Sequence, residues 1–237
     1  MKKPTDKPPS SNMYTGAKTW NPFKGCGFDC VYCRPSFQAQ AKRQLHNCRK
    51  CYDFVPHAHP ERLSKIPRAD LIFACGNGDL SFAAPEYTQR VIEAIRERGK
   101  SRTFYLQSKR PEVFAPFLGS LPANVILVTT LETNRDDGYR EISKAPPPSE
   151  RYRQFLALDY PRKVLTIEPV MDFDLDVFVG WILQLRPEYV WVDYNSRPKQ
   201  VQLPEPSVDK LKAFTQALTS ANILIKNRCR SPSLIQV

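Results

Sequence analysis

Three cysteines near the start of the chain have the spacing of a metal centre. Cys26, Cys30 and Cys33 form a C-x3-C-x2-C array within the stretch Trp20–Cys33. Three thiols cannot all pair into disulfides with one another, but three thiolates suit a cubane [4Fe–4S] cluster whose fourth iron has no protein ligand. An iron of that kind can bind a small molecule. The array therefore predicts a cluster that takes part in chemistry.

The same region also allows a zinc site. Cys30 and Cys33 form one C-x2-C pair, Cys48 and Cys51 form another, and fourteen residues separate the pairs. That spacing is close to the spacing of zinc ribbons. A four-cysteine zinc site would not need Cys26, which favours the cluster, but the cysteines alone leave both interpretations open.

A second group of metal-ligating residues follows directly. All three histidines of the protein, His46, His57 and His59, lie within a stretch of fourteen residues that also holds Cys48 and Cys51. We therefore expect a candidate second metal, either zinc or an auxiliary cluster, held by the two cysteines rather than by the histidines. The alternative is a polar loop with a free or disulfide-bonded pair of thiols.

Composition limits the class of protein. Five of the seven cysteines of this 237-residue chain fall between positions 26 and 51, which favours metal binding in a reducing compartment over scattered disulfides. No apolar run approaches the roughly 20 residues that span a bilayer, and the N-terminus has no apolar signal core. We expect a cytoplasmic protein without a membrane partner. The net charge of +11 fits either a polyanionic partner or a well-solvated surface.

Short apolar runs alternate with amphipathic stretches from residue 69 onward, which predicts β/α units with right-handed crossovers. A first strand is expected near Lys18–Asn21, ahead of the cysteines, and a helix at Pro35–Gln44 after them. Later buried parallel strands are expected at Leu71–Ala74, Thr103–Leu106, Val125–Thr130, Val164–Ile167, Tyr189–Val192 and Ile223–Ile225. Helices are expected at Pro85–Arg98, Pro111–Leu118, Ser149–Leu158, Leu175–Leu185 and Ser207–Ser220.

The pattern predicts an α/β fold: a single, incomplete β/α barrel of about six parallel strands. It would occupy residues 13–237, with a Cys/His-rich insertion at about residues 45–60. Residues 1–12, where lysines lie among prolines, are expected to form a disordered basic tail.

Polar residues follow every predicted strand from the second onward. Helix caps and turns would account for one or two such segments but not for six, and the chemistry of β/α barrels lies at the C-terminal ends of the strands. The segments therefore predict a functional mouth. They are Gly76–Asp79, Gln107–Arg110, Glu132–Arg135, Glu168–Pro169, Asp193–Ser196 and Lys226–Arg228.

Six short motifs resemble, in order, a phage- and prokaryote-associated branch of the radical S-adenosylmethionine (SAM) superfamily. They are Thr19–Pro22, His59–Leu63, Gly78–Leu80, Lys109–Glu112, Glu132–Asn134 and Ile167–Pro169, and the resemblance covers about residues 18–228. It implies an iron–sulfur enzyme that reductively cleaves SAM to a 5′-deoxyadenosyl radical, which abstracts hydrogen from a substrate. It also implies an electron donor such as flavodoxin or ferredoxin.

The resemblance further implies roles for individual residues. The three cysteines of the array would hold the cluster, and Tyr32 would lie near the adenine. A glycine-rich turn would contact the SAM amino group, with an aspartate where the superfamily more often has glutamate; its residues are Gly76, Asn77, Gly78 and Asp79. Glu132 and Asn134 match the strand end that contacts the ribose, and Glu168 would contact SAM or substrate.

Seven cations fall on strand ends or on the loops that follow: Lys109, Arg110, Arg135, Arg197, Lys199, Lys226 and Arg228. One of these cations could neutralise the SAM carboxylate. Seven are more than SAM requires, so they predict an anionic substrate such as a nucleotide or nucleic acid. We expect substrate contacts from Lys109, Arg110, Asp193 and Lys226. The alternative from another class is a non-catalytic, zinc-dependent nucleic-acid-binding protein that uses the four cysteines of the two C-x2-C pairs.

Overall fold

The computed structural model describes residues 16–226. The expected tail at residues 1–12 and the strand-end residues Asn227 and Arg228 lie outside the described residues. One parallel sheet carries seven strands, whose order in the sheet follows the chain. The strands are β1 (Lys18–Trp20), β4 (Leu71–Ala74), β5 (Thr103–Gln107), β6 (Val125–Thr130), β7 (Lys163–Ile167), β8 (Tyr189–Val192) and β9 (Ile225–Lys226).

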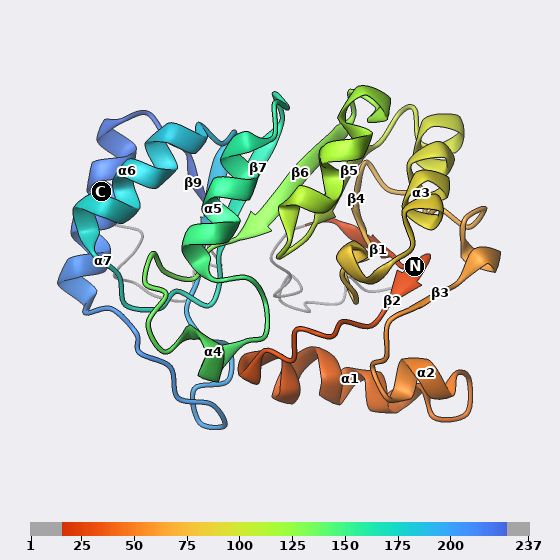
Figure 1. Ribbon diagram of the computed structural model, residues 1–237, viewed down its shortest axis with the longest axis horizontal. Helices are drawn as coiled ribbons and strands as arrows, with labels where there is room; N and C mark the ends of the chain where they lie inside the picture. The colour runs from red at the N-terminus through yellow and green to blue at the C-terminus, as the bar shows by residue number, and fades with distance from the viewer. Residues whose placement is uncertain (1–15, 227–237) are drawn as a thin grey trace, which may run out of the picture.

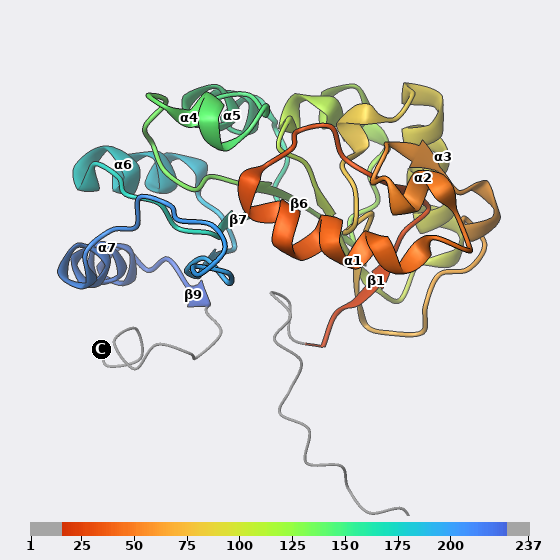
Figure 2. The ribbon, with the colours of Figure 1, turned by 90° about the horizontal axis from the view of Figure 1, so that it is seen from below.

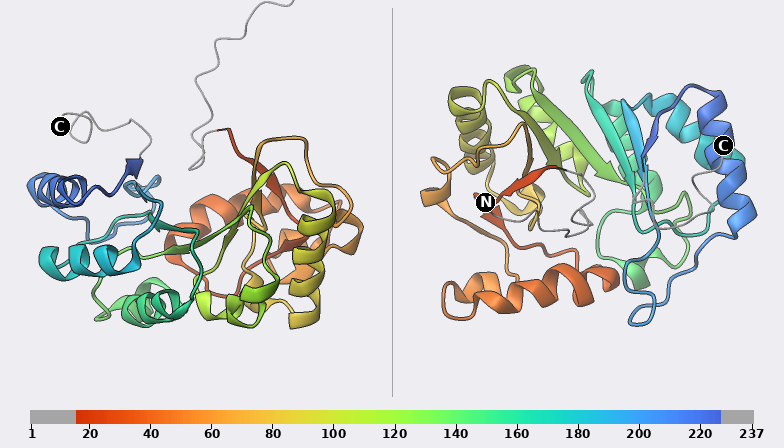
Figure 3. Two further views of the ribbon diagram at one scale, coloured as in Figure 1. Left: turned by 90° about the horizontal axis from the view of Figure 1, so that it is seen from above. Right: turned by 180° about the vertical axis from the view of Figure 1, so that it is seen from behind.

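The helices of the β/α units lie on one face of this sheet, and the view from behind in Figure 3 shows the strands in front of them. These helices are α3 (Pro85–Arg98), a 3₁₀ helix (Pro111–Ser120), α4 (Tyr139–Ile142), α5 (Pro148–Ala157), α6 (Leu175–Leu185) and α7 (Val208–Ser220). Within the described range, β1 and β9 do not pair with each other. The sheet is therefore an open, partial barrel, as the sequence predicts.

Each central strand is buried on both faces, which is why its sequence is continuously apolar. Alternate residues such as Ile72, Phe104 and Leu127 join the large core beneath the helices. The residues between them face the inside of the barrel, where Tyr105, Ile126, Val128, Val164 and Tyr189 form a smaller cluster. The Tyr189 hydroxyl donates to the Tyr105 hydroxyl at 2.8 Å there.

Local sequence signals explain where α3 begins and ends. Pro85 occupies the first turn, where a missing amide donor costs nothing, and the backbone amide of Gly99 closes the last turn on the Ile95 carbonyl. Tyr87, Val91 and Ile95 are buried on one face of the helix, at the helical spacing that a core-facing stripe requires.

The segment between β1 and β4 departs most from expectation. The single helix expected at Pro35–Gln44 is instead a chain of short pieces: 3₁₀ at Val31–Cys33, π at Arg34–Gln38, α1 (Ala39–Ala41) and 3₁₀ at Lys42–Gln44. The insertion then forms α2 (Arg49–Tyr52) and β3 (His57–Ala58), and β3 pairs antiparallel with β2 (Phe23–Lys24). The sequence did not predict this two-stranded sheet, because each strand is only two residues long and the two strands are far apart in the chain. The last strand is also displaced from its expected position, Ile223–Ile225.

This segment crosses the end of the sheet toward which the β6 arrow points (Figures 1 and 2). The cysteine array therefore lies at the carboxyl ends of the parallel strands. Two further short 3₁₀ helices, Pro60–Arg62 and Leu80–Phe82, connect it to the sheet and to α3. None of the helices within residues 16–226 is long and apolar enough to cross a membrane.

Gly25 allows the loop that carries Cys26, Cys30 and Cys33, the cysteine loop, to pack directly on the insertion. Its φ is +85°, and a Cβ at this position would lie 2.1 Å from the Val55 carbonyl oxygen. We expect Gly25→Ala to lower the free energy of unfolding by about 1–3 kcal/mol, the range for a strained non-glycine backbone. Gly119→Ala is the matched control, because a Cβ on Gly119 meets nothing within 4 Å. Urea unfolding measures both, and equal stabilities would contradict the close approach.

Candidate functional site

A cavity of about 590 Å³ opens at the carboxyl ends of the strands. Its wall combines thiols, amides, carboxylates and aromatic rings from segments far apart in the chain. The residues that matter chemically are Cys26, Cys30, Tyr32, Cys33, Gly76, Asn77, Gly78, Asp79, Gln107, Lys109, Thr130, Glu168, Tyr194 and Arg197. The parallel sheet brings them together because all its strands end at the same edge.

The three cysteines are free thiols on the wall of this cavity. Cys30 has an extended backbone, and the 3₁₀ turn that follows brings the amide of Cys33 to 2.9 Å from the Cys30 carbonyl. Phe28, which is 2% exposed, packs edge-on against Phe82 and anchors the loop. All three thiols lie on the wall of one cavity, and those of Cys30 and Cys33 are close enough to bond to each other. Three cysteines on one wall are the ligand set of a cubane that keeps one iron open.

The charges around the cysteines differ from one thiol to the next. The Cys33 thiol bonds to Cys30 and holds the pKa of Cys30 well below its usual range against the effect of burial, with help from the Lys109 cation. Lys109 Nζ lies 3.3 Å from Cys30 Sγ, and Ser143 Oγ lies 3.1 Å from it. Burial raises the pKa of Cys26, and Asp79 raises it further. The surroundings of Cys30 therefore favour an anionic sulfur.

Glu132, which is 0% exposed, is the centre of the buried charge beside the cysteines. Lys109 Nζ donates to its Oε1 at 2.6 Å and Arg151 Nη2 to its Oε2 at 2.7 Å. The hydroxyls of Tyr32 and Tyr139 also donate to Oε1. Burial alone would raise the pKa of Glu132, but the charges of Arg151 and Lys109 hold that pKa well below its usual range. The carboxylate is ionised at neutral pH.

Asp79 is the second buried carboxylate, 5% exposed. It accepts hydrogen bonds from the Ser81 amide at 2.9 Å, the Ser108 hydroxyl at 2.7 Å and the Lys109 amide at 2.9 Å. Burial raises its pKa, and the bonds from Lys109 and Ser108 oppose that rise. In this structure Asp79 joins the glycine-rich turn to the end of β5.

The glycine-rich turn packs directly on the start of the cysteine loop. The Gly25 amide donates to the Asn77 carbonyl at 2.9 Å, and the Asp79 amide donates to the Gly25 carbonyl at 3.2 Å. A Cβ on Gly78 would approach the Gly25 oxygen to 2.9 Å. The glycine-rich turn and the cysteine loop, which the family resemblance expects to contact the cofactor, therefore form one wall of the cavity.

Not all of the predicted site residues reach the cavity. Glu132 lies beneath its wall. The Asn134 side chain donates to Asp174 at 3.2 Å. Three more predicted residues do not line the cavity. The Arg110 guanidinium lies 5.7 Å from the ring centre of Phe28, and Lys226 lies over the Tyr189 ring. The Asp193 carboxylate accepts a hydrogen bond from the Tyr194 amide.

The structure also pairs some of the cations that suggested an anionic substrate. Lys109 is bound to Glu132, and Arg135 bonds to both Asp172 and Asp174 at 2.6 Å. Arg197 lines the cavity and has no carboxylate partner within the described part of the chain. Fewer of these cations are therefore available to an anionic ligand than the sequence predicts.

Several residues of the site escaped the sequence reasoning. Arg151 and Tyr139 belong to helices in later β/α units, and no short motif marks them. The sequence places Gln107 only in a polar strand end. Its Nε2 donates to Thr130 Oγ1 at 2.7 Å, whereas its Oε1 is buried and has no hydrogen-bond partner among residues 16–226.

The two C-x2-C pairs do not meet in a four-cysteine site among the described residues. Cys48 and Cys51 instead group with His57 and His59, with all four ligand atoms within 4.8 Å of one another. Cys30 and Cys33 lie with Cys26 on the cavity. The sequence expects a second metal to be held by the cysteines rather than by the histidines. In the structure His57, in β3, and His59, just after it, both lie beside the two cysteines.

Comparison with known proteins shows the fold. No protein-family model and no curated protein matches the chain. A radical SAM methyltransferase from Sphaerobacter thermophilus superimposes with a TM-score of 0.59 at 16% identity, over 90% of this chain and 67% of that one. SuiB from Streptococcus suis, in complex with the precursor peptide SuiA, gives 0.55 at 9% identity, over 90% and 49%. The chain thus spans about half the length of SuiB, and its fold is the partial barrel of radical SAM enzymes.

The Glu132 network predicts a specific loss of stability. Glu132→Ala would leave the buried guanidinium of Arg151 without its partner, so we expect it to lower the free energy of unfolding by about 3–5 kcal/mol. Glu97→Ala is the control, since Glu97 is exposed on α3. Denaturant unfolding of both variants measures the difference, and a loss no larger than that of the control would contradict a central role for this carboxylate.

The same network predicts a pH dependence. The folded pKa of Glu132 lies below its unfolded value of about 4.3, so its contribution to stability is complete above that pH and is lost as the pH falls. Between pH 6 and pH 3 we expect wild type to lose more stability than Glu132→Gln does. Parallel slopes for the two proteins would contradict the depressed pKa.

Proposed function

We propose that this protein is a radical SAM enzyme that abstracts hydrogen from an anionic substrate. One observation carries the proposal: three free cysteines line a cavity at the carboxyl ends of a partial barrel of the radical SAM type. The chemistry of such barrels occurs at that end of the sheet. A cysteine array at the amino ends of the strands would not have supported an active site.

The residues present fit a [4Fe–4S] cluster and SAM. Cys26, Cys30 and Cys33 would be the ligands, since all three line the same cavity. Bound there, the cluster supplies one electron, which cleaves the C5′–S bond of SAM to give methionine and a 5′-deoxyadenosyl radical. The Lys109 cation, 3.3 Å from Cys30 Sγ, offsets negative charge on the thiolate. Hydrogen bonds and charges around the sulfurs are among the features by which a protein tunes such a cluster.

An unpaired buried acceptor supports a polar ligand in the cavity. Gln107 Oε1 is buried without a hydrogen-bond partner in the part of the chain that the structure describes, although buried polar atoms are nearly always hydrogen-bonded. Its Nε2 is held by Thr130 Oγ1, so the orientation of the amide is fixed. We assign Gln107 Oε1 to accept a hydrogen bond from a hydroxyl or amino group of SAM.

The other predicted SAM contacts keep their assignments as proposals where they line the cavity. Tyr32, the glycine-rich turn from Gly76 to Asp79, and Glu168 do so. Trp191 Nε1 donates to Glu168 Oε2 at 3.1 Å and holds that carboxylate at the wall. Glu132 acts by fixing Tyr32 and Lys109 from below, and neither it nor Asn134 is assigned to the ribose.

The substrate proposal rests on the loop after β8. Arg197 and Lys199 are exposed there, and Arg197 reaches the cavity. Charge-assisted hydrogen bonds from such groups suit phosphate oxygens, so we propose a nucleotide or nucleic acid as the substrate. The net charge of +11 also suits an acidic electron donor such as flavodoxin or ferredoxin. We propose that the reaction takes place in the cytoplasm, where thiols stay reduced.

The first prediction concerns the cluster. Cys30→Ala should lose the four irons and the formation of 5′-deoxyadenosine together, because the cubane here has only three protein ligands. Cys75→Ala is the matched control: Cys75 is also a buried free cysteine, but it lies off the cavity wall. Iron and sulfide analysis after anaerobic purification, with deoxyadenosine assayed by chromatography, measures both. Retention of iron and activity by Cys30→Ala would overturn the proposed function.

The second prediction concerns substrate charge. Arg197→Ala should weaken binding to single-stranded nucleic acid, and the slope of log affinity against log salt should become shallower by about one unit for each phosphate that the variant fails to bind. Lys100→Ala is the control, because it removes the same charge at the opposite end of β5. It should change the affinity for nucleic acid and the salt slope less than Arg197→Ala does. If the two variants behave alike, the nucleic-acid substrate is wrong, and a peptide, the kind of partner bound to SuiB, becomes the class to assay.

A further inference from the structure

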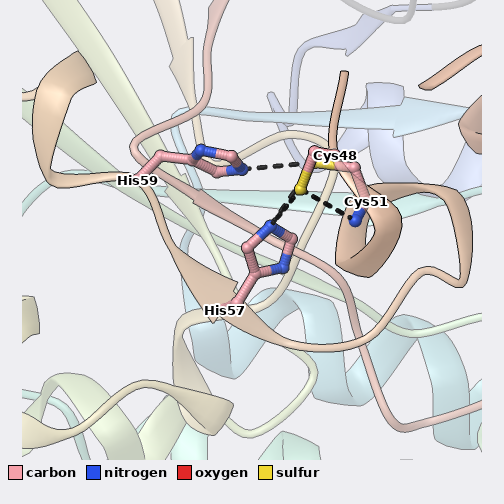
Figure 4. Close-up of side chains that lie close together, drawn as sticks. All are labelled: Cys48, Cys51, His57 and His59. Carbon is pink, nitrogen blue, oxygen red and sulfur yellow. Dashed lines mark hydrogen bonds between the residues drawn. The ribbon is translucent and has the colours of Figure 1, made fainter. Parts of the chain in front are cut away.

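Four side chains of the insertion converge on one point, away from the cavity. His57 Nε2 lies 3.3 Å from Cys48 Sγ and 3.4 Å from Cys51 Sγ, and His59 Nε2 lies 3.2 Å from Cys51 Sγ (Figure 4). For a tetrahedral ion bound at about 2.0–2.3 Å, adjacent ligand atoms are separated by about 3.3–3.8 Å. The observed distances are close to that range.

The local sequence explains the convergence. Cys48 caps the N-terminus of α2, and Cys51 follows three residues later on the same face, with its amide donating to Cys48 Sγ at 3.3 Å. His57 and His59 are two residues apart on an extended segment, so their side chains leave it on the same side. The helix turn supplies two thiols and the strand supplies two imidazoles.

Each imidazole is oriented by a hydrogen bond on its other nitrogen. His57 Nδ1 lies 2.7 Å from the Val55 carbonyl oxygen, and His59 Nδ1 lies 2.9 Å from Glu61 Oε1. Because a carbonyl and a carboxylate can only accept, both Nδ1 atoms carry the proton. Both Nε2 lone pairs therefore face the sulfurs, as ligating histidines do in metal sites.

We propose that Cys48, Cys51, His57 and His59 bind one structural zinc ion. Two thiolates and two imidazoles are a standard ligand set for tetrahedral zinc, and four protein ligands leave no open position for catalysis. An iron–sulfur cluster with two cysteines and two histidines would place the two kinds of ligand on different irons. The sulfur and nitrogen atoms would then be farther apart than the 4.8 Å within which all four lie.

The zinc ion braces the loop that carries the cysteine array. β3, which includes His57, pairs with β2 immediately before Cys26. The His59 amide donates to the Pro22 carbonyl at 2.6 Å, and the Cys26 amide donates to the Phe54 carbonyl at 3.3 Å. Two paired strands of two residues each have too few ladder bonds to be stable alone. The metal holds α2 to β3, and through the pairing of β3 with β2 it fixes the position of Cys26.

The test measures zinc and iron separately in anaerobically purified protein. Wild type should contain about one zinc per chain, and Cys48→Ser combined with His57→Ala should contain less than a tenth of that. His46→Ala is the matched control: it removes the one histidine outside the group and should keep its zinc. Cys30→Ala should also keep its zinc, so that failure of the iron assignment and failure of the zinc assignment are distinguishable.

Two outcomes would overturn the zinc site: wild-type protein without zinc, or wild-type iron and sulfide in excess of one cubane that is lost with Cys48. Should the double variant not fold, wild type alone decides. In that case the thiols of wild type are titrated with a mercurial while released zinc is measured. Release of zinc as two thiols react supports the site. Zinc that stays bound after those thiols have reacted overturns it.

The bracing role has its own measurement. Amide hydrogen exchange of residues 23–26 should be at least tenfold faster in the zinc-free double variant than in His46→Ala, while exchange in β6 should be the same in both. Equal rates at residues 23–26 would show that the metal does not hold the cysteine loop.

Discussion

The ionised carboxylate of Glu132 is the interaction on which the rest of the site depends. It is buried just after β6 and binds Lys109 from the loop after β5, Arg151 from α5 and the hydroxyls of Tyr32 and Tyr139. A buried charge is costly unless each of its lone pairs is satisfied. Glu132 meets that requirement only when the cysteine loop, two strand ends and two helices are in place together. The position of Tyr32, between Cys30 and Cys33, is thereby tied to the completed barrel.

This arrangement changes the meaning of the basic residues. The sequence presents a row of cations at the mouth of a barrel, but Lys109 and Arg135 each bind carboxylates of the protein itself. Their charges hold strand ends and loops together. Arg197, which has no such partner in the described range, is the better candidate for an anionic ligand. A cation on a strand end is evidence of substrate binding only once its local partners are known.

Two kinds of metal chemistry are proposed side by side in the first 60 residues, and the geometry separates them. The three cavity cysteines line a space of about 590 Å³, which leaves room for a ligand, as a cluster with one open iron requires. The ligand atoms of Cys48, Cys51, His57 and His59 are packed within 4.8 Å, as a closed zinc site requires. Because β2 and β3 join the two segments, a closed site can stiffen an open one without touching its ligand.

The sequence by itself determined the class of fold and the cysteine array. Apolar runs such as Val125–Thr130 identify buried strands because a parallel strand is covered on both faces, and thiolate spacing is a local property of the chain. Tertiary structure alone decided which polar strand ends face the cavity, which cations are paired, and that His57 and His59 join Cys48 and Cys51. Those outcomes depend on contacts such as Arg151 with Glu132, 19 residues apart, and on the pairing of two strands of two residues each from separate parts of the chain. No local pattern encodes such contacts, because they form only when separate β/α units pack into one sheet.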